Sequence, residues 1–192
     1  MGRLIQGIGY NDGKYPTRAK GKDFKEYKLW SGVLERCFSS PYHAQKPSYI
    51  GCTVSENFKS YSYFHEWCQS QIGFGQKGYH LDKDLLLKGS KVYSEDLCVF
   101  IPRDLNVLLT SCAKVRGELP VGVTRNGCGY MAQLSVFKKH HYLGTFKTSE
   151  EAFQAYKQAK EAHIKDMAKL YKNQVDIRVY NALMSYQVEV TD

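Results

Sequence analysis

Residues 121–156, VGVTRNGCGYMAQLSVFKKHHYLGTFKTSEEAFQAY, decide the fold of the C-terminal part of the chain. Residues 121–146 carry many β-branched and aromatic side chains between turn residues, which is typical of strands. Asn126-Gly127 is a dipeptide favoured in tight hairpin turns, and KKHHYLGTF supplies a third strand. The segment TSEE is a capping sequence for a helix over 149–172. We therefore predict a three-stranded antiparallel sheet packed on one helix, in an α+β fold.

Successive side chains of a strand point to opposite faces, so one face of this sheet is expected to pack on the helix. The expected helix-facing residues are Met131, Leu134, Val136 and Phe146. The residues expected to point away are Arg125, Tyr130, Gln133, Ser135, Phe137, Lys139 and His141, next to Lys138. An outer face of this composition can contact DNA bases and phosphates, and an ordinary solvated face is the alternative. His140 is assigned a structural role.

The N-terminal part is predicted to begin with two amphipathic helices, over 23–40 and 56–71, joined by a loop that contains prolines. Their inner faces are expected to be Phe24, Tyr27, Trp30, Leu34 and Cys37, then Phe58, Tyr61, Phe64, Trp67 and Cys68. Strands are expected at 79–87 and 97–101. A short helix should follow from Pro102 to Leu109, because proline is favoured at a first helical position.

The formal net charge of +8 suggests an acidic partner, either nucleic acid or an anionic membrane surface. Two tracts concentrate this charge, as neutralisation of phosphates requires. They are residues 1–22, which we interpret as an extended basic arm, and residues 114–148. The candidate DNA contacts that these tracts add to the sheet residues are Arg3, Lys14, Arg18, Lys20 and Arg116.

The sequence also argues against several classes of protein. It contains no run of about 18 apolar residues, so we expect no membrane span or membrane partner. The N-terminus has no apolar signal-peptide core, so we expect a cytoplasmic protein with reduced thiols. The six cysteines form no CxxC pair and no CxxC…HxxxH spacing, which argues against structural zinc.

Three stretches of the C-terminal part resemble the ethylene-response-factor-type domain, which occurs in plant transcription factors and in phage and mobile endonucleases. They are Gly122-Val-Thr, Tyr130-Met-Ala-Gln-Leu-Ser, and the run YLGTF-x-T-x-EEA-x-x-AY from Tyr142. The resemblance implies a three-stranded sheet that enters the major groove of duplex DNA and meets bases and phosphates. This chain has fewer arginines on that face than the plant pattern, so weaker sequence selectivity is expected.

A second set of motifs is similar to a phage family of HNH-like, His-Me finger endonucleases, many of them homing or mobile enzymes. The motifs are Tyr27-x-x-Trp30-x-x-Val-Leu-x-Arg36-Cys37, Tyr49-x-Gly-Cys-Thr-Val54, Phe64-x-x-Trp67, Leu81-Asp-Lys-Asp84, Tyr93-Ser94, Cys98-Val-Phe-Ile-Pro102 and Asn106. The order of the two resemblances along the chain matches that family.

We therefore expect four parts: a basic arm at 1–22, an HNH-like domain at 23–110, the DNA-binding domain at 118–175, and a helix or strap at 176–192. The resemblances imply an endonuclease of a bacteriophage that acts on double-stranded DNA, and we expect a monomer in the cytoplasm of the host cell.

The HNH-like resemblance further implies one divalent cation, Mg²⁺ or another, that stabilises charge developing on the phosphate. Asp82 or Asp84, together with Asn106, would supply oxygen ligands suited to Mg²⁺. The choice between the two aspartates stays open.

The histidine expected beside the acid is missing, because Lys83 or Leu85 stands there. His80 is the nearest replacement, although we expect it to face away from the aspartates together with Lys83. Three hypotheses follow: water bound to the metal attacks with little base assistance, His80 or Lys83 acts as an unusual base, or the nuclease is degenerate. In the last case the chain is a DNA-binding regulator or counter-defence factor. A protein-interaction module whose basic face meets an acidic protein is a further alternative.

Overall fold

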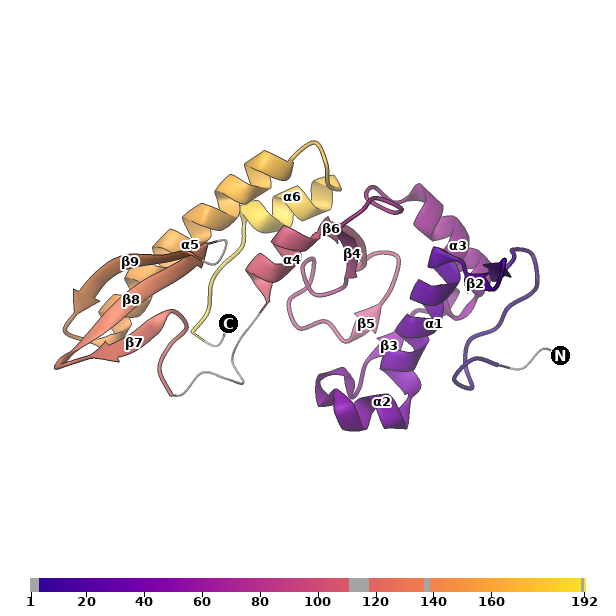
Figure 1. The fold of residues 1–192 in the computed structure, drawn as a ribbon, viewed down its shortest axis with the longest axis horizontal. Coiled ribbons are helices and arrows are strands. Elements are labelled where there is room, and N and C mark those ends of the chain that lie inside the picture. Colours follow the sequence, from indigo (N-terminus) through magenta and orange to yellow (C-terminus); the bar gives the residue numbers. More distant parts are fainter. Residues whose placement is uncertain (1–3, 111–117, 137–138, 191) are drawn as a thin grey trace. The chain divides into compact units, whose positions relative to one another are not determined.

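The computed structural model describes residues 4–110, 118–136, 139–190 and 192, and the chain folds into two compact units. The first unit comprises Met1–Arg103 and Gln174–Val179, and the second comprises Asp104–Asn173 and Tyr180–Asp192. Helices and small sheets alternate along the chain (Figure 1), so the predicted α+β class is confirmed.

Short helices open the first unit. They are α1 Lys25–Phe38, α2 Ser40–Gln45, the 3-10 helices Pro47–Tyr49 and Asn57–Lys59, and α3 Tyr61–Ser70. The two predicted amphipathic helices are confirmed, with later starts. The loop expected between them is wrong, because proline suits the first turn of a helix, where its missing N–H has no intrahelical partner. The Ser39 hydroxyl caps α2 by accepting the Tyr42 N–H at 3.3 Å.

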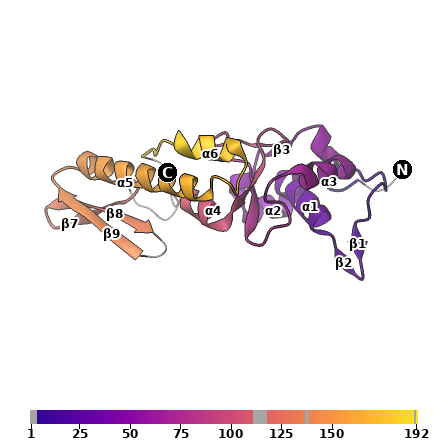
Figure 2. The same ribbon diagram turned by 90° about the horizontal axis from the view of Figure 1, so that it is seen from above.

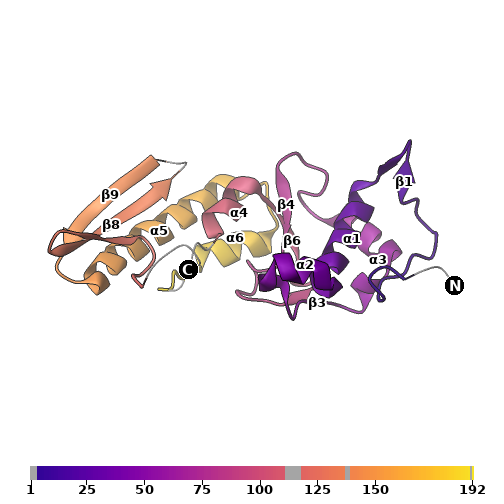
Figure 3. The ribbon, with the colours of Figure 1, turned by 60° about the horizontal axis from the view of Figure 1, so that its bottom comes forward.

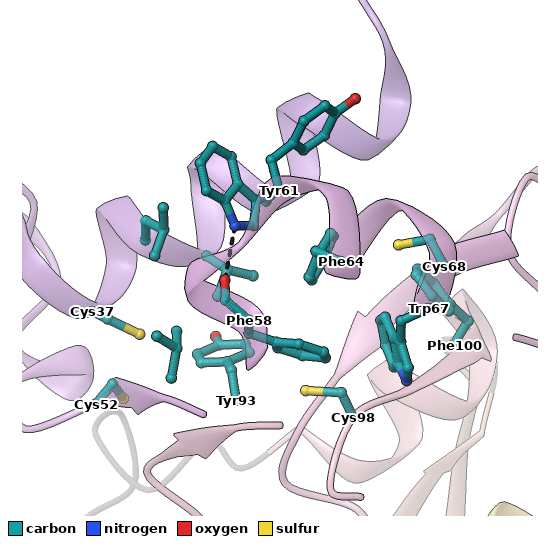
Figure 4. Packing of buried hydrophobic residues seen from close by; sticks show 14 residues of the cluster. Cys37, Cys52, Phe58, Tyr61, Phe64, Trp67, Cys68, Tyr93, Cys98 and Phe100 are labelled. Atoms are coloured by element: carbon teal, nitrogen blue, oxygen red, sulfur yellow. Dashed lines mark hydrogen bonds between the residues drawn. The ribbon is translucent and has the colours of Figure 1, made fainter. Parts of the chain in front are cut away.

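The core of the first unit is built from the aromatic stripes of these helices (Figure 4). Trp30 Nε1 donates to the backbone oxygen of Phe58 at 2.8 Å, which ties α1 to the segment before α3. The Phe58 ring meets Phe64 and Trp67 edge-on, at centroid distances of 5.0 and 4.8 Å. Such edge-to-face pairs add stabilisation beyond burial alone. The predicted inner faces are therefore confirmed, except at Phe24, which is exposed at the start of α1.

Three two-stranded sheets complete the first unit. They pair β1 Arg18–Ala19 with β2 Lys22–Asp23, β3 Thr53–Val54 with β5 Val92–Tyr93 in parallel, and β4 Tyr79–Asp82 with β6 Val99–Pro102. The strand predicted over 79–87 ends at Asp82. Asp82 Oδ1 accepts the N–H groups of Asp84 and Leu85, and an aspartate that bonds the backbone ahead of it makes a turn.

The N-terminal residues do not form the extended arm that their composition predicted. Gly9 is buried where an added Cβ would collide with Leu34 and Trp30. Tyr10 N donates to Lys59 O at 2.9 Å, and Tyr61 N donates to Tyr10 O at 3.0 Å. The segment is therefore packed on the first core, because its few apolar and glycine residues outweigh its charge in deciding where it lies.

The second unit contains the predicted sheet and helix. Its elements are α4 Arg103–Leu109, β7 Val123–Asn126, β8 Gly129–Val136, β9 Lys139–Phe146 and α5 Ser149–Tyr171, while α6 Ile177–Met184 includes residues of both units. The strand order is β7-β8-β9, and α5 runs along one face of the sheet (Figure 2). The hairpin turn is Gly127–Cys128, one residue later than predicted, because Asn126 still pairs with Gly129.

The predicted capping sequence is confirmed at the start of α5. Thr148 Oγ1 accepts the Glu151 N–H at 3.2 Å, and Glu151 Oε2 accepts the Thr148 N–H at 3.3 Å, which is a capping box. Although α5 has 23 residues, neither it nor any other helix of the described residues is long and apolar enough to cross a membrane.

Candidate nucleic-acid interface and the predicted metal site

The pairing of β7, β8 and β9 determines which side chains of the sheet share a face. Ala132 and Leu134 are buried on the side of α5, so the alternate residues Met131, Gln133 and Ser135 lie on the opposite side. Residues directly opposite each other in an antiparallel pair point to the same face. The ladder therefore extends this assignment from β8 to both neighbouring strands.

A bulge in β9 changes the side-chain alternation of that strand. Ala132 pairs with Gly144 but Gln133 pairs with Tyr142, so Leu143 is an extra residue in β9. The side of the sheet away from α5, which we call the open face, consists of Thr124, Asn126, Gly129, Met131, Gln133, Ser135, His140, Tyr142 and Thr145.

Four of the seven residues that were expected on the open face are not there. Arg125 pairs with Tyr130, Lys139 with Val136, and His141 with Leu134, so all four belong to the side of α5. Tyr130 was misplaced because it is three positions from Gln133 and the two cannot share a face of a regular strand. Lys139 and His141 were misplaced because the bulge at Leu143 reverses the alternation of the residues before it.

Gln133 and Ser135 are placed as predicted, whereas Met131 lies on the open face and not against the helix. His140, which was assigned a structural role, is exposed on the open face, with its Nδ1 3.5 Å from Ser135 Oγ. Burial, Lys160 and His141 together lower the pKa of His163, which is a residue of α5. His141 therefore lies close to that helix. Phe137 and Lys138 lie outside the described residues.

The open face is polar and carries no lysine or arginine among its described residues. Tyr142 is 66% exposed, and its hydroxyl lies 3.0 Å from Thr145 Oγ1. Amide, hydroxyl and imidazole groups can exchange hydrogen bonds with base edges. Cations stand at the borders of the sheet, where Arg125, Lys139 and Lys147 are exposed.

The cations of the N-terminal tract are partly neutralised. Lys14 Nζ is 2.5 Å from Glu66 Oε1, and Arg18 Nη2 is 3.0 Å from Asp23 Oδ1. Lys20 is exposed in the turn between β1 and β2. Arg3 and Arg116 lie outside the described residues. This tract therefore offers less free positive charge than its composition suggests.

The predicted catalytic segment, Asp82-Lys83-Asp84, forms an internally bonded turn. The burial of Asp82 raises its pKa against the opposing effect of two backbone N–H donors. Lys83 is buried, and its Nζ lies 2.6 Å from Asp84 Oδ1 and 2.5 Å from Ser90 O. These two bonds tie together the ends of the turn at 83–90 and occupy Nζ, so its geometry does not suit a general base.

His80 shares a face with Asp82, because the two residues are two positions apart in β4. The expectation that His80 faces away from that aspartate is therefore wrong. His80 itself is exposed. It lies on a strand whose partner, β6, is completely buried.

The described residues hold both predicted carboxylate ligands, Asp82 and Asp84, in bonds within the turn. They contain no group of three or more His, Cys, Asp or Glu side chains that could hold a metal ion. The Asp84 carboxylate is already paired with the Lys83 ammonium. Asp82 is half-buried and accepts two backbone N–H groups, whereas Asp84 is exposed but paired with Lys83.

No protein-family model, curated protein or solved structure matches this chain.

Proposed function

We propose that the chain binds duplex DNA through the open face of the β7–β9 sheet. The observation that carries the proposal is that α5 covers one face of this sheet, while the other presents polar side chains and an exposed tyrosine. A narrow β-ribbon fits the major groove of DNA. The resemblance of the YLGTF and EEA motifs to a sheet-type DNA-binding domain supports the same partner.

The side chains of the open face assign the contacts. Gln133, at the centre of β8, can make a bidentate hydrogen bond to adenine, and Tyr142 lies directly across from it in β9. Arg125 and Lys139 belong to the α5 side but are exposed near strand ends, and the exposed Lys147 follows β9. From the borders of the sheet these cations can reach phosphates, which fix orientation more than sequence. A face with a few hydrogen-bonding groups and no central arginine fits modest sequence selectivity.

The test is a fluorescence anisotropy titration of a labelled duplex with wild type and with the double variant Q133A/Y142A. Each good base contact contributes about 1–3 kcal/mol, so we expect the double variant to bind at least about tenfold more weakly. The matched control is Q154A/Q158A, which removes two exposed side chains from α5. Equal affinity for all three proteins would refute the assignment of the open face.

Cleavage of the bound DNA is not part of this proposal, because both carboxylates of the Asp82–Asp84 turn are engaged in bonds within the turn. A plasmid that carries phage DNA, incubated with Mg²⁺ or with EDTA, tests that conclusion. We expect no nicking in either condition. Mg²⁺-dependent nicking that D82A or D84A loses would restore the endonuclease hypothesis, whereas binding without nicking suits a regulator or a counter-defence factor.

A further inference from the structure

A basic surface lies in the first unit, around α2 and the 3-10 turn that follows it. Residues 36–55 and 85–94 contain no Asp or Glu. Their basic residues are Arg36, His43, Lys46, Lys88 and Lys91. The structure brings the two stretches together, because β3 pairs with β5 and Lys91 Nζ donates to Ser48 O at 2.6 Å. Figures 1 and 3 both show α2 beside β3.

Arg36 gives this surface a half-buried positive charge. Its guanidinium lies near Tyr93, and against the effect of burial this interaction raises the pKa of Arg36. The Tyr93 ring also lies 5.6 Å from Lys83 Nζ. Arg18 and Arg178 are paired with aspartates, but no carboxylate forms an ion pair with Arg36 among the described residues. A partly desolvated cation without a counter-charge attracts an anion from outside.

The groups around Arg36 are held in place by the fold. His43 Nε2 donates to the backbone oxygen of Arg36 at 2.8 Å, which fixes α2 against α1. The Tyr42 and Tyr49 rings meet edge-on at 5.6 Å. Lys46 is the C-cap residue of α2 and is exposed. In the sequence it lies between Tyr42 and Tyr49. The surface is thus built from ordered elements and not from a flexible charged tail.

We infer that this surface, which we call the α2 surface (Arg36, Tyr42, His43, Lys46, Tyr49 and Lys91), binds phosphate groups of the DNA backbone. The inference rests on the proposed function, since it takes duplex DNA as the partner. It adds a contact in the first unit that is independent of the open face. Lys and Arg at such a contact release counterions from the duplex, and tyrosine hydroxyls add hydrogen bonds to phosphate oxygens.

An acidic protein surface is the competing occupant. Ile50 and Val92 are exposed within the same two stretches, with 58% and 37% of their surface accessible. The absence of any carboxylate over both stretches favours a uniformly anionic partner, which a DNA backbone is.

The test is the salt dependence of binding to a random-sequence duplex, measured by anisotropy for wild type and for K46Q/K91Q. Each phosphate contact contributes about 0.9 to the slope of log K against log salt, so the slope should fall by about two. The control, K28Q/K77Q, removes the same charge from two exposed lysines elsewhere in the first unit and should keep the wild-type slope. The single variant K46Q, which removes an exposed side chain, should lower the slope by about one if the double variant misfolds.

The outcomes separate this inference from the proposed function. An unchanged slope in K46Q/K91Q, with binding weakened in Q133A/Y142A, overturns the α2 surface and leaves the open face intact. A reduced slope together with unchanged binding of Q133A/Y142A supports the α2 surface and overturns the open face. No duplex binding by the wild-type protein overturns both, and an acidic protein would then be the partner to seek.

Discussion

The two units of the chain are stabilised in different ways. The first unit encloses fully buried aromatic side chains such as Trp30, Phe58 and Phe64, supplied by two helices and the turn between them. The second unit has a thinner interior in which one helix covers one face of a sheet, with Ala132 and Ala152 at the contact. The first unit therefore depends on packing between distant segments. The second also buries side chains of α5, such as Phe153 and Ile164, and it adds two local features, namely a bulge in β9 and a capping box at α5.

The largest effect should follow from removing an aromatic side chain of the first core. We expect W30A to reduce the free energy of unfolding by about 3–5 kcal/mol, because it leaves a cavity and leaves the Phe58 carbonyl without its donor. Urea unfolding followed by fluorescence measures this loss of stability. The control, Y142A, removes a similar ring from the exposed open face and should change stability by less than about 0.5 kcal/mol. Similar losses in both variants would contradict the difference in burial.

The milder variant W30F keeps most of the ring but removes the N–H that donates to Phe58 O. A buried carbonyl without a partner costs about 1–3 kcal/mol. A loss in this range would attribute part of the W30A effect to the hydrogen bond, whereas wild-type stability would assign the whole effect to volume.

The same difference explains what the sequence could predict. The helical stripes in 23–40 and 56–71 predict burial well, because a helix repeats one face every 3.6 residues and both stripes point into one core. In the sheet, alternation predicts burial correctly at Leu134 but gives the wrong face for Arg125, Tyr130, Lys139 and His141. Single-residue errors matter more in a strand, because a shift of one position reverses every side chain.

The sequence does not reveal that Leu143 is an extra, bulged residue of β9. Gly144, which has φ of +139°, is a sign that the strand is irregular there, since glycine accepts backbone conformations that other residues avoid. No residue type predicts which neighbour is the extra one. For this reason the sequence did not place His140 and Tyr142 on the open face. The turn made by Asp82 was not predicted either, because an aspartate at the end of a strand can bond the backbone or bind a metal, and its position alone does not distinguish these roles.

A smaller effect is expected at the capping box of the second unit. T148A removes the hydroxyl that accepts the Glu151 N–H, and loss of such a cap costs about 1 kcal/mol. Thermal unfolding followed by circular dichroism measures the change. S149A is the matched control, because Ser149 Oγ donates to the neighbouring Glu150 carboxylate at 3.0 Å and not to the helix backbone, so its removal should have little effect. A loss in S149A as large as that in T148A would show that the hydroxyl of Thr148 is not the cap.

The smallest effects concern two aspartates of the first unit with opposite pKa shifts. Burial raises the pKa of Asp82, so its charged form weakens the folded state, and this penalty grows as pH rises through the raised pKa. The hydrogen bond from Arg178 lowers the pKa of Asp176, so its stabilisation is present above the ordinary pKa and is lost as pH falls through the lowered one.

The matched variants are D82N and D176N, compared by urea unfolding between about pH 3 and pH 7, the range in which carboxyl groups of ordinary pKa near 4 titrate. D82N keeps an oxygen that can accept the N–H groups of Asp84 and Leu85 but removes the charge, so it should match or exceed wild-type stability at pH 7. D176N should be less stable than wild type at pH 7 and should approach it at low pH. A loss of stability in D82N at pH 7 would mean that the Asp82 charge has a stabilising partner, and it would reopen the case for a cation at this turn.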